Sequence, residues 1–190
     1  STFKNEALRL PGIESITRMT GTPTNIQMGT RGVQWPGKDP GLQVRFLQAS
    51  AGYDLVNTLH LKVIAGRDFS RSFPSDSTGY IINEAALKRI GYKDPIGRPI
   101  TLWDKKGTII GVLKDFHTAS LHRAIEPLIL RIGEDETYGD ILIRTQPGKT
   151  REALASAEKL CRELNPSFPF TYNFSDEEYK KLYQNEQVVT

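Results

Sequence analysis

The chain has 190 residues, of which 38% are hydrophobic and 25% charged, a balance that is typical of a globular domain and excludes an intrinsically disordered chain. The 25 Lys and Arg residues against 22 Asp and Glu residues leave a net charge of +3 without any block of like charges, so nucleic acid is not indicated as a partner. The single cysteine, Cys161, excludes an internal disulfide framework and a multi-cysteine metal site.

The first forty residues predict a helix, a strand and a long irregular stretch. Phe3–Leu10 reads as a short helix, because Pro11 and Gly12 would stop it, and Ile13–Met19 follows as a strand. Gly21–Gly41 is rich in Gly, Pro, Thr and Asn, so it is expected to form a loop-and-hairpin region.

Short elements follow in the next forty residues. Alternating apolar positions predict a strand at Gln43–Gln48. Asp54 is expected to cap a short helix that ends at Leu59, and Leu61–Ile64 is expected to be extended. Arg67–Gly79 carries Asp, Ser and Pro, which is typical of a surface loop.

The centre of the chain holds the sharpest local signals. Tyr80–Ile82 is a strand candidate, Asn83 is expected to cap a helix, and Gly91 lies where a C-terminal glycine belongs. Two strands come next, at Ile100–Trp103 and Thr108–Leu113, and the turn between them is at Asp104–Gly107. Gly107 is expected to supply the positive φ of that turn.

The last third predicts more strands and the clearest helix. Pro127–Ile132, Ile141–Thr145 and Phe168–Phe174 are strand candidates, and Arg151–Leu164 is an amphipathic helix. Ser175 and Glu178 have the spacing of a capping box that opens a last helix toward Tyr183. The fold class is therefore α+β (mixed α/β), with one βαβ-like unit between residues 141 and 174.

The histidines give no metal-binding pattern. His117 and His122 are five positions apart and His60 is distant, whereas zinc sites on helices use spacings of about three or four. Asp115 and His117 come nearest to an acid–base pair, but no serine in a G-x-S-x-G context and no cysteine lies beside them. We interpret Asp115 as an acceptor of backbone N–H bonds in the turn after the preceding strand.

Other reactive groups also have structural interpretations. Cys161 shares the expected apolar helix face with Leu154, Ala157 and Leu164, where a thiol packs as a small hydrophobic side chain. The run Glu134–Glu136 is interpreted as a solvated hairpin tip, and no phosphate-binding glycine motif occurs. We predict that the chain is not an enzyme and holds no catalytic, cofactor-binding or metal site.

Four motifs occur in order along the middle of the chain: Ala65-Gly66-Arg67-Asp68-Phe69, Ile81-Ile82-Asn83-Glu84-Ala85-Ala86, Asp94-Pro95-Ile96-Gly97-Arg98-Pro99-Ile100 and Ile109-Ile110-Gly111-Val112-Leu113-Lys114-Asp115-Phe116-His117. This succession resembles the periplasmic core domain of MacB/FtsX-type ABC transporter permeases. The run Leu10–Glu14 resembles the opening of that domain after the first membrane helix, and Tyr172–Tyr183 resembles the run that leads back into the membrane.

The motif residues have roles that the residue types alone predict. Gly66 permits a turn, Arg67 can reach carboxylates or carbonyl groups, and Gly111 allows a close approach within a strand. The motif residues that we expect to maintain the fold are Gly66, Arg67, Phe69, Asn83, Glu84, Asp94, Pro95, Gly97, Gly111, Val112, Asp115 and Phe116.

The resemblance implies one extracytoplasmic domain over residues 1–190 that has two lobes. A membrane-proximal lobe with the βαβ unit would comprise residues 1–44 and 127–190, and an inserted β-rich lobe would comprise 45–126. The domain would lie on the periplasmic side of the bacterial inner membrane. The isolated domain is expected to be a monomer or a weak dimer.

The implied function is non-catalytic. Such a domain transmits ATP-driven motion across the membrane to export, extract or release a substrate, or to activate a periplasmic partner. The implied partners are a cytoplasmic ABC ATPase that binds the ATP, a second permease copy, and a periplasmic adaptor or substrate protein, with loops 21–41 and 67–79 as candidate contacts. The alternative is an extracytoplasmic ligand-binding sensor domain of a membrane receptor, which would need a concave pocket with convergent polar groups.

Overall fold

The structure of the chain, a computed structural model, describes residues 2–118, 124–134, 138–167 and 169–175. Its helices are α1 (Thr2–Ala7), α2 (Leu55–Leu59), a 3-10 turn η1 (Pro74–Thr78), α3 (Glu84–Ile90) and α4 (Thr150–Leu164). Its strands are β1 (Ile13–Met19), β2 (Gly29–Thr30), β3 (Val33–Gln34), β4 (Phe46–Ala51), β5 (Val63–Gly66), β6 (Gly79–Asn83), β7 (Pro99–Leu102), β8 (Lys105–Leu113), β9 (Leu128–Ile132) and β10 (Asp140–Thr145). The predicted mixed α+β class is confirmed.

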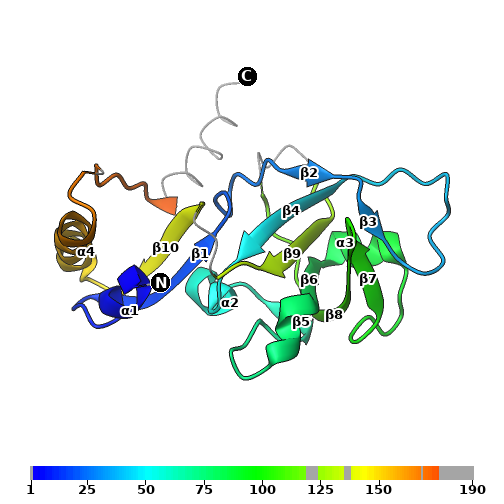
Figure 1. Cartoon of the computed structure of the whole chain (residues 1–190), viewed down its shortest axis with the longest axis horizontal. Coiled ribbons are helices and arrows are strands. Elements are labelled where there is room, and N and C mark those ends of the chain that lie inside the picture. Colours follow the sequence, from blue (N-terminus) through cyan, green and yellow to red (C-terminus); the bar gives the residue numbers. More distant parts are fainter. Residues whose placement is uncertain (1, 119–123, 135–137, 168, 176–190) are drawn as a thin grey trace, which may run out of the picture.

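The strands form one mixed sheet that runs along the molecule. Its order is β10-β1-β4-β9-β6-β8-β7-β3, with β2 added beside β4 and β5 beside β8. The pairs β4–β9 and β6–β8 are parallel and the remaining pairs are antiparallel. In Figure 1, α1 and α4 lie with β1 and β10 at one end, and β3, β7 and α3 lie at the other.

Buried apolar side chains form three clusters along the sheet. The first, at the α3 end, includes Ile82 and Ile109. The second, in the middle, includes Leu55 of α2. The third joins α1, β1 and α4 through side chains such as Ala7 and Ile16. Each helix is therefore held to the sheet by burial of its apolar face, which is the main source of its stability.

The N-terminal predictions are confirmed for β1 and corrected on either side of it. The first helix ends at Ala7 and not at Leu10. In the region 21–41, β2 and β3 do form, but they do not pair with each other as a hairpin would. They pair with β4 and β7 instead, and such long-range pairing leaves no signal in the local composition.

Two helix starts show where capping signals succeed and fail. Asn83 accepts a hydrogen bond from the Ala86 N–H at 2.9 Å, and Gly91 closes α3 with a φ of 83°, so both predictions for α3 are confirmed. Asp54 has the position of a cap for α2 but makes no side-chain cap bond. Its backbone is left-handed, with a φ of 69°, whereas a capping residue is normally extended, and its carboxylate lies 3.4 Å from the Arg71 guanidinium.

The turn between β7 and β8 is shorter than the sequence indicates. Leu102 pairs with Lys105, so Trp103 and Asp104 alone make the turn, and the positive φ, 54°, falls on Trp103. The prediction that Gly107 supplies a positive φ is wrong. Gly107 lies within β8, where a Cβ atom would come 1.9 Å from the Thr78 carbonyl oxygen, so it is required for close approach and not for the turn.

The C-terminal βαβ prediction is wrong within the described residues. β10 and α4 form close to the predicted bounds, but residues 169–174 are in no strand and therefore do not complete the unit. Of the predicted last helix, only Ser175 is described, and Glu178 and Tyr183 lie outside the described residues.

The two lobes stay a prediction. β9, which belongs to the expected membrane-proximal lobe, lies between β4 and β6, which belong to the expected insert. The sheet is thus continuous across both of the expected lobe boundaries at residues 44 and 126.

Candidate functional site

Three motif residues, Asn83, Glu84 and Asp115, lie where β6, α3, β8 and β9 meet. Asn83, at the end of β6, has no exposed surface, and its side chain makes three hydrogen bonds. Its Oδ1 accepts from the N–H groups of Ala86 and Leu128, both at 2.9 Å, and its Nδ2 donates to the Glu126 carbonyl at 3.0 Å. One amide therefore begins α3 and also fixes the start of β9.

Glu84 and Asp115 connect α3 to the end of β8. Asp115 Oδ1 accepts from the Ala85 N–H at 3.0 Å, and Glu84 Oε2 accepts from the Asp115 N–H at 2.8 Å. Asp115 therefore accepts from the first turn of α3, and not from the turn after β8 where we expected its partner. Negative charge at this place also suits the partial positive charge of a helix N-terminus.

Arg67 and Asp76 fasten the loop that follows β5. Both guanidinium N–H groups donate to the carboxylate at 2.7 Å, and Asp76 also accepts from the Ser70 N–H at 2.8 Å. The hydrogen bond with Asp76 is the main reason why the pKa of Arg67 is raised. Burial alone would raise the pKa of Asp76, but the bonds from Arg67 and Ser70 and the charge of Arg67 outweigh it and lower the pKa.

Two motif glycines allow the backbones of β5 and β8 to approach. A Cβ atom on Gly66, which has a φ of 69°, would lie 2.2 Å from the Ile110 carbonyl oxygen. A Cβ atom on Gly111 would lie 2.2 Å from the Arg67 carbonyl oxygen. Both distances are far below any real Cβ contact, so a larger residue would push the two segments apart.

The other motif residues also serve packing and turn geometry. Phe69 and Val112 are buried in the core, and Phe116 packs against the central cluster. The Asp94–Gly97 turn is attached to β8 by a bond from the Gly97 N–H to the Ile109 carbonyl at 2.8 Å. The contacts named for these residues are therefore contacts that maintain the fold.

A second polar cluster, centred on Glu134, was not predicted from the sequence. Glu134 Oε1 accepts from Lys4 Nζ and from Arg71 Nη2, both at 3.1 Å, and Oε2 accepts from the Tyr53 N–H at 2.9 Å. The Tyr53 carbonyl in turn accepts from Lys4 Nζ at 3.3 Å and from Thr17 Oγ1 at 2.8 Å. We call these five residues the Glu134 joint.

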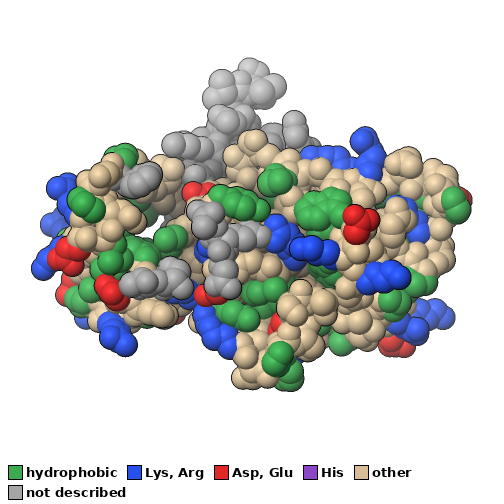
Figure 2. Space-filling model, viewed as in Figure 1, with side chains coloured by type: hydrophobic (Ala, Val, Ile, Leu, Met, Phe, Trp, Pro, Cys, Tyr) green, Lys and Arg blue, Asp and Glu red, His purple; other side chains and the backbone are tan. Residues whose placement is uncertain are grey.

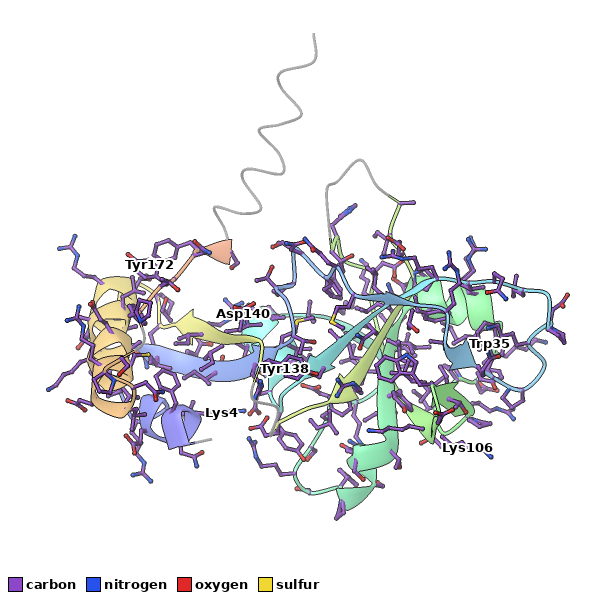
Figure 3. The ribbon with its side chains drawn as sticks, turned by 45° about the horizontal axis from the view of Figure 1, so that its top comes forward. Lys4, Trp35, Lys106, Tyr138, Asp140 and Tyr172 are labelled. Carbon is purple, nitrogen blue, oxygen red and sulfur yellow. The ribbon has the colours of Figure 1, made fainter. Side chains whose placement is uncertain are left out.

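The Glu134 joint unites five segments that are far apart in the sequence. They are α1, β1, the turn after β4, the loop after β5 and the turn after β9. Figure 3 shows Lys4 on the side of α1 that faces the centre of the molecule. Its side chain is 7% exposed and that of Glu134 is 17% exposed, so solvent screens the pair only weakly.

The Glu134 joint corrects one sequence interpretation and has a defined charge state. Glu134 is not part of a solvated tip, and Asp135 and Glu136 lie outside the described residues. Burial would raise the pKa of Glu134, but the Tyr53 N–H, the bond from Lys4 and the charges of Lys4 and Arg71 outweigh it, so the pKa is lowered. Glu134 is therefore ionised at neutral pH.

The described residues offer little for catalysis or metal binding. Within them, no group of three or more His, Cys, Asp or Glu side chains could hold a metal ion. His60 is exposed and His117 is half-buried, whereas His122 lies outside the described ranges. Burial raises the pKa of the half-buried Cys161, which opposes formation of a reactive thiolate.

The face of α4 that packs on the sheet differs from the predicted one. Ala153, Ala157 and Leu160 are buried, whereas Leu164 is 36% exposed and Cys161 only half-buried. Small alanines allow the helix to approach α1 closely. The predicted face was chosen from the spacing of larger apolar residues, so it missed Ala153.

A shallow depression lies beside α2. Val56, Asn57, His60, Leu61 and Asp68 line it. The Asp68 carboxylate in this depression already accepts hydrogen bonds from the Phe69 N–H at 2.7 Å and from the Val56 N–H at 3.1 Å. Burial is the main cause of the raised pKa of Asp68.

Among the described helices, none has the length and apolar character needed to cross a membrane.

Comparison with known proteins identifies the family. The family model of the MacB-like periplasmic core domain matches residues 2–158. The structure is similar to the periplasmic region of MacB from Actinobacillus actinomycetemcomitans, with a TM-score of 0.66 and 16% identity over 100% of this chain and 83% of that chain. No match was found among curated proteins.

Two further solved structures share the fold. The extracellular domain of the noncanonic ABC-type transporter YknZ from Gram-positive bacteria has a TM-score of 0.64 and 14% identity, over 88% of this chain and 84% of that one. A domain of a putative permease protein from Porphyromonas gingivalis has a TM-score of 0.57 and 19% identity, over 86% of this chain and 79% of that one.

The family match spans both polar clusters, since residues 2–158 include the motif residues and all five residues of the Glu134 joint. The solved structures extend the same fold over most or all of the chain. The chain belongs to the MacB-like periplasmic core domain family, and it is an extracytoplasmic domain of a MacB-like ABC transporter permease.

Proposed function

We propose that this domain transmits ATP-driven motion mechanically, from the membrane part of its permease to the periplasmic side, and catalyses no reaction. The result of that motion is export, extraction or release of a substrate, or activation of a periplasmic partner. ATP binds a separate cytoplasmic ATPase and not this chain. A second permease copy and a periplasmic adaptor or substrate protein complete the proposed assembly.

The observation that supports this proposal is the Glu134 joint. By resemblance, the run Leu10–Glu14 comes after the first membrane helix of the permease, so we take α1, which directly precedes that run, as the segment through which movement of that helix enters this domain. Lys4 of α1 is bonded to Glu134 at 3.1 Å and to the Tyr53 carbonyl at 3.3 Å. Displacement of α1 is therefore passed to the turns after β4 and β9, which hold the centre of the sheet.

The Lys4–Glu134 pair is the enclosed part of the Glu134 joint, whereas the Arg71 side chain is 56% exposed. Arg71 packs over the Tyr53 ring with 4.4 Å between the guanidinium carbon and the ring centroid, while also binding Glu134. Removal of one member of an enclosed ion pair leaves its partner without compensation, so the alternatives to the intact arrangement are costly. Apolar packing between α1 and α4 supports the same attachment.

The sensor alternative is not retained, because the family is a transporter component and the depression beside α2 presents an acid that already binds the backbone. Loops 21–41 and 67–79 remain proposed contacts for periplasmic partners. Loop 67–79 is anchored by the Arg67–Asp76 pair and contacts the Glu134 joint through Arg71. A partner bound to this loop would therefore be displaced when α1 moves.

Distance measurements on the full-length permease with its ATPase test the proposal. Cys161 is replaced by alanine, and Thr108, an exposed residue of β8, is changed to cysteine for a spin label on each permease copy. We expect the distance between the two labels to change when a non-hydrolysable ATP analogue is added. Glu134→Gln should reduce this change at least twofold, because it weakens the attachment of α1.

The matched control is Glu158→Gln, which removes an exposed charge that pairs with Arg162 on the surface of α4. It should leave the nucleotide-dependent change intact. The mechanical proposal fails if nucleotide does not alter the label distance in the parent protein. The role of the Glu134 joint fails if both substitutions behave alike.

A further inference from the structure

Asp54 lies beside the Glu134 joint and closes three of its contacts into a ring of charges. Glu134 Oε1 lies 3.1 Å from Lys4 Nζ and 3.1 Å from Arg71 Nη2. Asp54 Oδ2 lies 3.4 Å from Arg71 Nη1 and 3.7 Å from Lys4 Nζ. Two cations and two carboxylates therefore alternate, and each charge faces both charges of the opposite sign. We call these four residues the charge ring.

The charge ring differs from the ion pairs on the surface of α4. There Arg162 lies 2.6 Å from Glu158, and Lys159 lies 4.0 Å from Glu163. Each of these charges has its partner one turn away on the same helix. Figure 2 shows acidic and basic side chains interspersed at that end of the molecule. The members of the charge ring instead come from four different segments of the chain, so the ring holds separate parts of the fold together.

The Asp54 side chain serves the charge ring and not the helix that follows it. Asp54 has the N-cap position of α2, but its side chain makes no cap bond and its backbone is left-handed, with a φ of 69°. Aspartate adopts this conformation more readily than most residues. The side chain is 48% exposed, and its carboxylate faces the two cations of the ring. A second carboxylate is therefore held within reach of α1.

Lys4 is bonded to Glu134 and lies just beyond hydrogen-bonding distance of Asp54. The Nζ–O distances are 3.1 Å and 3.7 Å. Lys4 also donates to the Tyr53 carbonyl at 3.3 Å, and Tyr53 directly precedes Asp54 in the chain. A shift of Lys4 Nζ by roughly 1 Å would bring Asp54 into hydrogen-bonding distance. The neighbouring Tyr53 carbonyl would stay within reach during this shift.

Arg71 keeps the carboxylates compensated during such an exchange. It lies 3.1 Å from Glu134 and 3.4 Å from Asp54, so it faces both acceptors at once. When Lys4 leaves Glu134, that carboxylate keeps its bonds from Arg71 and from the Tyr53 N–H. Without them, a carboxylate that is only 17% exposed would be left uncompensated, which is strongly unfavourable. The charge ring therefore has two arrangements in which every charge keeps a partner.

We propose that Asp54 is a second acceptor for Lys4, and that α1 has two attached positions. In one, Lys4 is bonded to Glu134 and joins α1 to the turn after β9. In the other, Lys4 is bonded to Asp54 and joins α1 to the start of α2. Passage between them lets α1 move while it stays attached to the domain. The use of this passage in transport rests on the proposed mechanical function, whereas the exchange of acceptors does not.

Hydrogen exchange of the α1 amides tests the second acceptor, in the full-length permease with its ATPase and without nucleotide. Amides of a short helix exchange when the helix opens or detaches. Glu134→Gln alone should accelerate exchange about threefold, because Lys4 passes to Asp54, and Asp54→Asn alone should have a smaller effect. The two substitutions together should accelerate it about tenfold or more, well above the product of the single effects.

A matched control removes an acid that lies far from the charge ring. Asp104 is exposed in the β7–β8 turn, which Figure 1 places at the far end of the sheet from α1. Asp104→Asn combined with Glu134→Gln should exchange no faster than Glu134→Gln alone. Exchange in a peptide over β8 should be equal in all variants, which separates release of α1 from general unfolding. If Glu134→Gln does not accumulate, Glu134→Asp, which keeps the charge on a shorter side chain, takes its place in the same comparison.

Two results would overturn the proposal. In the first, the double variant exchanges no faster than Glu134→Gln, which means that Asp54 does not take over Lys4. In the second, Asp54→Asn accelerates exchange equally when Lys4→Met is also present, which means that Asp54 does not act through Lys4. Both results are obtained without nucleotide, so they leave the mechanical function to be decided separately by the label distances.

Discussion

Arg67 and Asp76 form a two-pronged ion pair in which both N–O distances are 2.7 Å and the Asp76 side chain is 1% exposed. The pair closes the loop after β5 against the start of β6. The Phe73 ring covers the guanidinium, with 3.9 Å between the guanidinium carbon and the ring centroid. A loop of polar composition is thereby made into a fixed part of the domain.

Removal of Asp76 should be strongly destabilising. Asp76→Ala leaves Arg67 and the Ser70 N–H without their acceptor, and because the Arg67 side chain is 35% exposed and can be hydrated, we expect a cost of about 2 kcal/mol. Urea unfolding of the isolated domain measures the change in the free energy of unfolding. Glu158→Ala, which breaks the exposed pair with Arg162, should cost less than about 0.5 kcal/mol. Equal effects of the two substitutions would show that the Arg67–Asp76 pair contributes nothing special.

Gly111 should tolerate no side chain. In Gly111→Ala the new Cβ atom would lie 2.2 Å from the Arg67 carbonyl oxygen, and separation of β5 from β8 should cost about 1–3 kcal/mol. Gly41→Ala is the matched control, because its Cβ atom would meet nothing closer than 3.4 Å. Thermal unfolding should show a clear decrease in Tm for the first variant and almost none for the second. An unchanged Tm for Gly111→Ala would contradict the close approach.

Acid should weaken the fold through Asp76 and Glu134. The pKa of each is lowered in the folded protein relative to about 3.9 and 4.3 in unfolded chains. Their contribution to stability is therefore complete above about pH 5, and it is lost as the pH falls through the folded pKa values. Asp68 acts in the opposite sense, because burial raises its pKa and the folded state takes up its proton first.

Urea unfolding between pH 7 and pH 3 tests this pH dependence. The parent domain should lose stability below about pH 4, and Glu134→Gln should lose less over the same range, because it no longer has that carboxylate to protonate. Parallel curves for the two proteins would mean that Glu134 has the same pKa in the folded and unfolded chains.

The sequence predicts elements whose signals are local. β1 has alternating apolar residues, and α3 has a cap at Asn83 and a stop at Gly91, and all three features are in the structure. The Glu134 joint could not be found in this way, because Lys4 and Glu134 are 130 residues apart and only the sheet order brings them together. An acidic run normally indicates solvent exposure, so Glu134 gave the wrong signal.

The β7–β8 turn shows a second kind of limit. Glycine is the usual residue at positive φ, so Gly107 was the reasonable expectation, yet Trp103 takes that conformation. Packing against Gly32 and the bond to Thr30 hold the tryptophan there, and neither contact is visible in the local sequence.

The isolated domain should be a monomer or a weak dimer at micromolar concentration. β10 lies at one end of the strand order, where Asp140 is exposed and Arg144 is held by a bond to the Thr58 carbonyl at 2.6 Å. Charged residues on an edge strand oppose pairing with a second sheet. In the proposed assembly, two copies tethered in one membrane would reach an effective concentration of about a millimolar, so a weak contact would suffice. Sedimentation velocity should give the mass of one chain, and a tight dimer would show that this domain carries its own assembly interface.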